Sequence, residues 1–291
     1  MITPERLVQG IAFPEGLAWD ADTETIVCCS VQTATVFRIW PAEHRKDVIC
    51  ELGAGGANNL TLAASGGIVV CQNGGVDAGP PMAARYPDME PLPPQQSTQP
   101  ALLLVAGTGE VTTIVDQGIN APNDITVDGG GGLVFTDPGN PFLEPRASPR
   151  VMRFADPEGL SVVAEGFAYC NGIVADGDSL LVTDHGGVLM LLPDGTRRWI
   201  LRYDDGNVDG LARDTEGRIY VARQANGGVD VIEDGAVVEF LELPGPAMTT
   251  NVCFGGPDMS SLFVTDARNG ALWVFADLPA RGAPVALWGD R

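Results

Sequence analysis

Polar side chains, five of them acidic or amide, stand at the start of six similar segments in this chain of 291 residues. In every segment the residue two places after the leading one is apolar. The leading residues are Glu15, Asn58, Asn123, Asn171, Asp209 and Thr250. Carboxylate and amide oxygens are the ligands that hard divalent cations such as Ca²⁺, Mg²⁺ and Mn²⁺ prefer. If the fold brings these positions together, the sequence predicts a divalent metal centre.

Each of the six segments has the pattern of a β-hairpin. An alternating apolar strand follows the leading residue, and a Gly/Asp turn precedes a second, β-branched strand that ends in a polar residue. In all six segments the closing polar residue lies 13 to 16 positions after the leading one. The closing residues are Ser30, Gln72, Asp137, Asp184, Arg223 and Asp266. Two more strands follow most hairpins, such as 36–40 with 48–52 and 229–233 with 237–240.

Successive leading residues lie 38 to 65 positions apart, and most of these steps match the roughly 40 to 50 residues of a four-stranded propeller blade. We therefore predict an all-β protein, with residues 1–291 forming a single six-bladed β-propeller of four-stranded antiparallel blades. Residues 6–13 or 285–288 would close the ring.

The longest step contains a Pro- and Gln-rich stretch at about 73–100. We interpret it as an insertion in the second blade. It is either a disordered surface excursion or a lid over the site, for which Arg85 and Tyr86 are the candidate contacts.

The innermost strand of every propeller blade lines the central tunnel, so the six leading side chains would meet at one end of the axis. Two carboxylates and several amides in one small space would repel one another or lack hydrogen bonds. A divalent cation would resolve both problems. Ordered water filling the tunnel is the alternative.

Five motifs together resemble the senescence marker protein/gluconolactonase/luciferin-regenerating-enzyme-like family of six-bladed propellers, and its organophosphate-hydrolysing relatives. They are FPEGLAWD, PNDITVDGGGGLVFTDP, CNGIVADGDSLLVTD, VDGLARDTEGRIYVA and TNVCFGGPDMSSLFVTDA. The resemblance covers nearly the whole chain except the insertion. It implies that Glu15, Asn171 and Asp209 bind the metal, and that Asn123 completes the metal shell or holds substrate.

The resemblance also implies a metal-dependent lactonase that opens a small lactone, of the aldonolactone or gluconolactonase-like class, with a metal-activated water. The cofactor would be one divalent ion, Ca²⁺ in the first place, with Zn²⁺, Mg²⁺, Mn²⁺ or Fe²⁺ as the other options. Asp209 is the candidate general base. The candidate substrate contacts are Asn123, Trp19, Asp137 and His185.

One departure from the family concerns specificity. Members that act on sugar lactones often carry an Arg two residues before the Asn of the PND motif, and this chain has Ala121 there. Preference for gluconolactone therefore does not follow from the resemblance. Two other functions stay open: hydrolysis of other esters or phosphotriesters at the same metal site, and a non-catalytic ligand-binding propeller.

Composition narrows the function classes. A net charge of −21 with only 17 Lys and Arg argues against nucleic-acid binding. GxSxG is absent and only His44 and His185 are present, so serine-type esterase chemistry is not expected. Six cysteines without a CxxC pair favour a cytoplasmic protein with reduced thiols. The sequence contains no long apolar stretch or leader pattern, so we expect no membrane partner. The expected partner is a small-molecule substrate.

Overall fold

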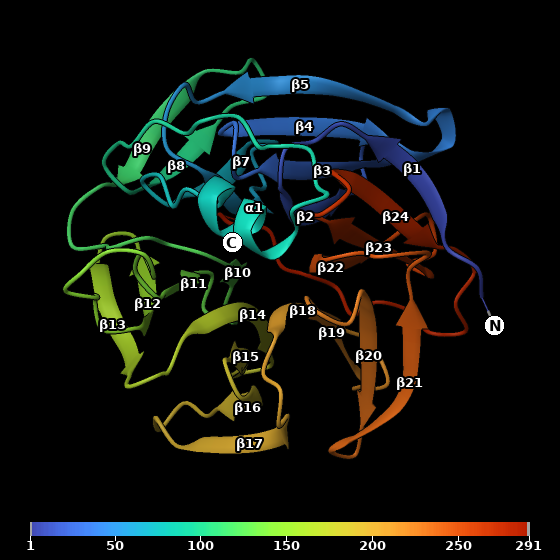
Figure 1. The fold of residues 1–291 in the computed structure, drawn as a ribbon. Coiled ribbons are helices and arrows are strands. Elements are labelled where there is room, and N and C mark those ends of the chain that lie inside the picture. Colours follow the sequence, from blue (N-terminus) through green and yellow to red (C-terminus); the bar gives the residue numbers. More distant parts are fainter. Residues whose placement is uncertain (1, 290–291) are drawn as a thin grey trace.

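The computed structural model describes residues 2–289, which form a ring of six antiparallel sheets with four strands each (Figure 1). Blade 1 contains β2 (Pro14–Asp20), β3 (Thr25–Ser30), β4 (Thr35–Trp40) and β5 (Arg45–Glu51). Blade 2 contains β6 (Ala57–Leu62), β7 (Ile68–Gln72), β8 (Ala101–Val105) and β9 (Val111–Val115). Blade 3 contains β10 (Ile125–Val127), β11 (Leu133–Asp137), β12 (Arg150–Ala155) and β13 (Gly159–Glu165). Blade 4 contains β14 (Cys170–Asp176), β15 (Ser179–Asp184), β16 (Gly187–Leu191) and β17 (Arg197–Arg202). Blade 5 contains β18 (Val208–Arg213), β19 (Ile219–Arg223), β20 (Gly228–Glu233) and β21 (Ala236–Glu242). Blade 6 contains β22 (Thr249–Gly255), β23 (Ser261–Asp266), β24 (Ala271–Phe275) and β1 (Glu5–Gln9). The predicted six-bladed β-propeller is confirmed.

The N-terminal strand closes the ring. Strand β1 pairs antiparallel with β24 and is the outermost strand of blade 6. Residues near the C-terminus form single bridges instead, from Gly282 to Asp214 and from Trp288 to Ala63.

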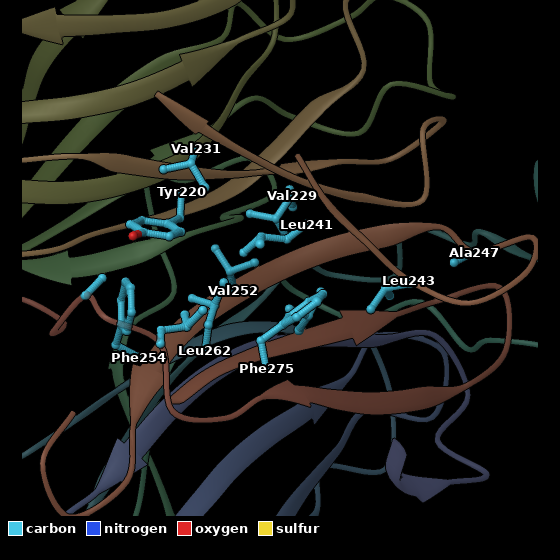
Figure 2. Close-up of a cluster of buried hydrophobic side chains, with 14 residues drawn as sticks. Tyr220, Val229, Val231, Leu241, Leu243, Ala247, Val252, Phe254, Leu262 and Phe275 are labelled. Carbon is cyan, nitrogen blue, oxygen red and sulfur yellow. The ribbon is translucent and has the colours of Figure 1, made fainter. Parts of the chain in front are cut away.

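The hydrophobic core consists of six clusters, each between two neighbouring blades. Because successive side chains of a strand point to opposite faces, Ile26 packs toward blade 6 and Val27 toward blade 2. Figure 2 shows the cluster between blades 5 and 6, where Tyr220 meets Phe254 edge to face at 4.8 Å between ring centroids. Both faces of the inner hairpins are buried, which explains their nearly continuous apolar sequence.

The insertion at 73–100 is folded against the ring. It contains helix α1 (Gly79–Arg85), which lies near the middle of the ring in Figure 1. Met82 of α1 is buried with Met248 and Ala267 of blade 6. Arg268 of blade 6 hydrogen-bonds Asp88 of the insertion at 2.7 Å. The interpretation as a disordered excursion is therefore replaced by a packed segment, here called the cap (residues 73–100).

Other short features complete the fold. A 3₁₀ helix, η1 (Pro41–Glu43), joins β4 to β5. No helix within residues 2–289 is long and apolar enough to cross a membrane. The six cysteines are free; five are buried and Cys253 is half-buried.

Candidate metal centre

A β-bulge marks the head of the inner strand in five of the six blades. The strand register shifts at Glu15/Leu17, Ala57/Asn59, Cys170/Ile173, Val208/Leu211 and Thr249/Val252. A bulge places two residues opposite one on the partner strand and re-aims their side chains. Five of the six predicted leading residues, all except Asn123, lie at these irregular segments, so their backbone is set apart from the regular ladder below them.

Glycine follows each of the three residues expected to bind metal. A Cβ added at Gly16, Gly172 or Gly210 would lie 2.5 Å from an atom of the next blade. The neighbouring atoms are Asn59 Cα, Leu211 Cδ2 and Asn251 Cγ. The absence of a side chain therefore lets adjacent blades approach closely where the ligands converge.

Three buried carboxyl groups meet at this end of the tunnel. Glu15, Asp124 and Asp209 are 4%, 3% and 2% exposed, and within residues 2–289 none of them pairs with a basic side chain. The amide nitrogen of Asn251 donates to Glu15 Oε2 at 3.1 Å and to Asp124 Oδ2 at 3.2 Å, which brings two of the acids to one amide.

This crowding raises the pKa of all three groups. Burial, followed by the charges of Asp209 and Asp124, raises the pKa of Glu15 well above its usual value. Burial and the charge of Asp124 do the same to Asp209. Burial raises the pKa of Asp124 to about 6. Without a cation, the charged form of the site is unfavourable.

Two buried side-chain oxygen atoms near these carboxyl groups have no hydrogen-bond partner in the described chain. Asn171 Oδ1 and Asp209 Oδ1 are buried, and neither has a hydrogen-bond partner in the described chain. The other oxygen of Asp209, Oδ2, accepts a hydrogen bond from Gln224. Buried polar atoms are normally satisfied, so these two oxygens are available to a ligand.

A chain of amides holds Asn123. Asn58 Nδ2 donates to Asn123 Oδ1, and Asn73 Nδ2 donates to Asn58 Oδ1 at 3.0 Å. Asn73 Oδ1 in turn accepts from the backbone of Gly75 at 3.0 Å. The base of the cap is thus connected to Asn123 through two side chains. Tyr169 directly precedes β14, and its pKa is raised by burial and by the charge of Asp209.

These residues fit a divalent cation of the hard type. In residues 2–289 no three His, Cys, Asp or Glu side chains gather closely enough to bind a metal unaided. Amide oxygens must therefore complete a shell around Glu15 and Asp209, and Asn171 offers an unpartnered one. Two carboxylates with neutral oxygens are a donor set suited to Ca²⁺ or Mg²⁺.

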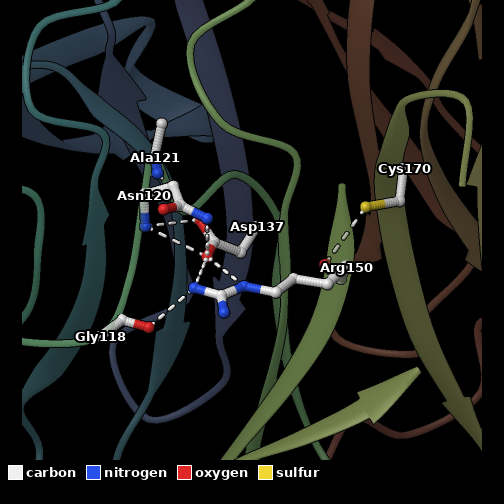
Figure 3. Close-up of polar contacts among 6 residues, drawn as sticks. All are labelled: Gly118, Asn120, Ala121, Asp137, Arg150 and Cys170. Atoms are coloured by element: carbon white, nitrogen blue, oxygen red, sulfur yellow. Dashed lines mark hydrogen bonds and ion pairs between the residues drawn. The ribbon is translucent and has the colours of Figure 1, made fainter. Parts of the chain in front are cut away.

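Asp137 has a different place from the one predicted. It is fully buried, and its carboxylate accepts hydrogen bonds from the backbone of Asn120 at 2.9 Å and of Ala121 at 2.8 Å (Figure 3). Arg150 Nη2 donates to the same carboxylate at 2.9 Å. With both oxygens occupied, Asp137 shapes the loop that leads to Asn123, and its contact with substrate stays a prediction.

The other two predicted substrate contacts lie at opposite ends of the tunnel. His185 is exposed and directly follows β15, whose end pairs with the head of β14 at Cys170, so it lies at the mouth near Asn171. Trp19 lies four residues beyond Glu15, about 13 Å along strand β2. It stacks on Phe263 and lines a cavity at the other end. Trp19 therefore lies far from Glu15, and its contact with substrate stays a prediction.

A family model decides the relationship. The model for the SMP-30/Gluconolactonase/LRE-like region matches residues 13–268. The chain belongs to this family. The resemblance inferred from the motifs is therefore confirmed.

Individual relatives of the family are more distant. Regucalcin from Xenopus laevis is 42% identical over 72 residues, and regucalcin from Gallus gallus is 38% identical over 80 residues. These matches cover 24% and 26% of both this chain and the relative, so they span about a quarter of the length of the curated relatives.

Solved structures share the fold over almost the whole chain. A calcium-binding protein, regucalcin, from Agrobacterium tumefaciens has a TM-score of 0.78 and 20% identity, covering 99% of this chain and 97% of that one. A gluconolactonase from Xanthomonas campestris has a TM-score of 0.74 and 23% identity, covering 96% and 89%. A luciferin-regenerating enzyme has a TM-score of 0.78 and 17% identity, covering 98% of each chain.

Sequence reasoning missed the second residue of each leading pair. Asn59, Asp124 and Asn251 are buried at the site, and Asp124 is its third carboxyl group. A signal for them was present, because the residue after the leading one is Gly in three blades and Asn or Asp in the other three. Gln224 and Tyr169 were also missed, since nothing in their local sequence marks them.

Proposed function

We propose that this chain is a metal-dependent lactonase, which hydrolyses a small cyclic ester at the head of the propeller tunnel. The observation that carries the proposal is the pair of unpartnered oxygens, Asn171 Oδ1 and Asp209 Oδ1, beside the buried Glu15. Family membership supports the reaction class. The likeness of the fold to the gluconolactonase from Xanthomonas campestris supports a lactone as substrate.

The protein side chains have distinct roles in this proposal. Glu15, Asn171 and Asp209, with Asn123, would hold one divalent cation, Ca²⁺ in the first place. Such a cation, when bound, supplies a Lewis acid for the lactone carbonyl and acidifies water. Asp209 accepts a hydrogen bond from Gln224 at Oδ2, and its carboxylate would accept the proton of the attacking water. The acyl–oxygen bond of the ring then breaks, and the proton passes to the leaving alkoxide to give a hydroxy acid.

The region around Asn123 bears on substrate choice. Ala121 is buried and its backbone N–H is held by Asp137, so it offers no charged contact to sugar hydroxyls. Tyr169 and the exposed His185 lie on the loops next to β14 and are the remaining candidates for substrate contacts. We therefore expect a lactone with few hydroxyl groups to be preferred over gluconolactone.

The proposal is tested by a proton-release assay on the full chain, stripped with chelator and reloaded separately with Ca²⁺, Mg²⁺, Mn²⁺ or Zn²⁺. The panel contains aldonolactones, simple γ- and δ-lactones, a linear ester and a phosphotriester. We expect lactone turnover that disappears with chelator, and a loss of about 10²- to 10⁴-fold in Asp209→Asn. Asp128→Asn removes one carboxylate at a hairpin turn, where Asp128 bonds Arg153, and should keep full activity.

Other outcomes would reject the proposal. Turnover of the phosphotriester or linear ester, with none of the lactones, would assign the site to the alternative hydrolase. No turnover with any metal would favour a ligand-binding propeller. Full activity of Asp209→Asn would remove the proposed base.

A further inference from the structure

A cavity of about 490 Å³ occupies the end of the tunnel away from the metal centre. Its wall includes the aliphatic side chains two places after each leading residue: Leu17, Leu60, Ile125, Ile173, Leu211 and Val252. Trp19, Phe254 and Met259 extend this apolar wall. The volume lies in the range of small-molecule pockets, roughly 300 to 1,000 Å³.

The inner end of the cavity is polar and presents an acceptor. Asn59, Asp124 and Asn251 line it. The amide oxygens of the two asparagines already accept from the backbone N–H groups of Leu60 at 2.5 Å and Val252 at 2.9 Å. The Asp124 carboxylate accepts from Asn251, but a carboxylate has about four acceptor positions. A group that binds next to Asp124 can therefore donate a hydrogen bond to it.

The outer end is bordered by the C-terminal segment. Residues 283–287, here called the strap, are among the lining residues. At one end of the strap, Ala283 N donates to Arg213 O of blade 5 at 3.0 Å; just beyond the other, Trp288 N donates to Leu62 O of blade 2 at 2.9 Å. The strap therefore crosses the mouth of the tunnel between blades on different sides of the axis.

We propose that this cavity is a second ligand site, which binds a small apolar alcohol or amine with its hydrogen-bond donor toward Asp124. The aliphatic ring accepts the apolar body, and the buried carboxylate accepts the donor. A carboxylate ligand would meet acceptors at the inner end, in a chain whose net charge is −21. Neither Glu15 nor Asp209 is among the residues that line this cavity, so the ligand would share only Asp124 and its amide neighbours with the metal centre.

The test uses three compounds with one skeleton: 1-adamantylamine, 1-adamantanol and 1-adamantanecarboxylate. The full chain, labelled at Ile, Leu and Val methyl groups, is titrated with each compound in chelator and again with Ca²⁺. We expect saturable shifts of the Leu17, Ile173 and Leu211 methyl signals with the amine, the alcohol or both. The carboxylate should bind at least about tenfold more weakly, because its oxygens leave Asp124 without a donor.

Two variants locate the binding. Ile173→Trp fills the tunnel and should weaken binding of the amine by at least about tenfold. Val238→Trp, on a residue that is 54% exposed on blade 5, should leave binding unchanged. If Ile173→Trp does not fold, the methyl shifts of the parent protein decide.

The proposal is overturned if no compound gives saturable shifts, as a tunnel that holds only water predicts. Shifts confined to residues outside the cavity, or equal affinity for the carboxylate and the amine, would also overturn it. Absence of lactone turnover would not affect these readouts, so the two proposals can fail separately.

Discussion

The hydroxyl of Thr183 in blade 4 donates a hydrogen bond of 2.8 Å to the backbone carbonyl of Asp209 in blade 5. The same hydroxyl accepts from the backbone of Gly172, next to Asn171, at 2.7 Å. One side chain thus connects the heads of two blades that carry expected metal ligands. Thr136 makes the equivalent bond to the carbonyl of Asn171 at 2.6 Å. These threonines set the spacing of the ligands through their backbones.

Replacing Thr183 by Val should therefore weaken the site without touching a ligand side chain. The variant leaves the Asp209 carbonyl and the Gly172 N–H without their partner, which costs about 1 to 3 kcal/mol of unfolding free energy. We expect a lower affinity for the cation, measured by calorimetric titration, and a lower urea midpoint. Thr183→Ser keeps the hydroxyl and should restore the affinity.

A matched control for this change is Thr113→Val, on the exposed side of β9. It should leave both measurements as in the parent. Equal cation affinity in Thr183→Val and the parent would show that the inter-blade hydrogen bond does not position the ligands.

The features that were predictable from sequence are those encoded locally. Hairpin spacing and polar leading residues recur within about 16 positions, so the six blades and the pair Glu15 and Asp209 could be identified from the chain alone. The position of Trp19 at the other end of the tunnel could not be predicted, because the sequence does not give the direction of β2 along the axis. In a β-strand, two residues that are four positions apart in sequence are separated by about 13 Å.

The remaining features depend on contacts between distant segments. Asp137 ends its strand at the position where a ligand is expected, but its partner Asn120 lies in the loop before β10 and its partner Arg150 begins β12. Only the fold brings these residues together. The cap could not be assigned either, because Met82 is buried by Met248 and Ala267 of blade 6. Such packing leaves no periodic signal in the insertion.

Cation binding should stabilise the protein strongly. A ligand that binds only the folded state at 100 times its Kd adds about 2.7 kcal/mol. We expect the thermal midpoint of the parent to rise with Ca²⁺ and to fall back with chelator. The double variant Glu15→Gln/Asp209→Asn should show no response, whereas Asp128→Asn should respond like the parent. A parent midpoint that ignores every divalent cation would contradict the metal centre.

The metal-free protein should lose stability as the pH rises from about 4 to about 6. The pKa values of Glu15, Asp124 and Asp209 are raised in the folded state, that of Asp124 to about 6. In this window the folded chain binds more protons than the unfolded chain, so the unfolding free energy decreases with increasing pH. Urea unfolding in chelator at several pH values measures the slope.

The double variant Glu15→Gln/Asp209→Asn separates this effect from the repulsion of the whole acidic chain. Its slope should be shallower than that of the parent, because two of the three raised groups no longer titrate. Asp116→Asn removes an exposed carboxylate and should keep the parent slope. Identical slopes in the parent and the double variant would show that these carboxyl groups are not responsible.

Met82→Ala should release the cap while the propeller stays folded. Met82 is 5% exposed and is the buried residue of α1, so its truncation removes most of the apolar contact between the helix and blade 6. We expect trypsin to cleave after Arg85 roughly ten times faster or more than in the parent. Cleavage after Arg146, on the exposed loop between β11 and β12, provides the internal control and should not change. If the parent and Met82→Ala are cleaved after Arg85 at the same rate, the packing of α1 on blade 6 does not hold the cap in place.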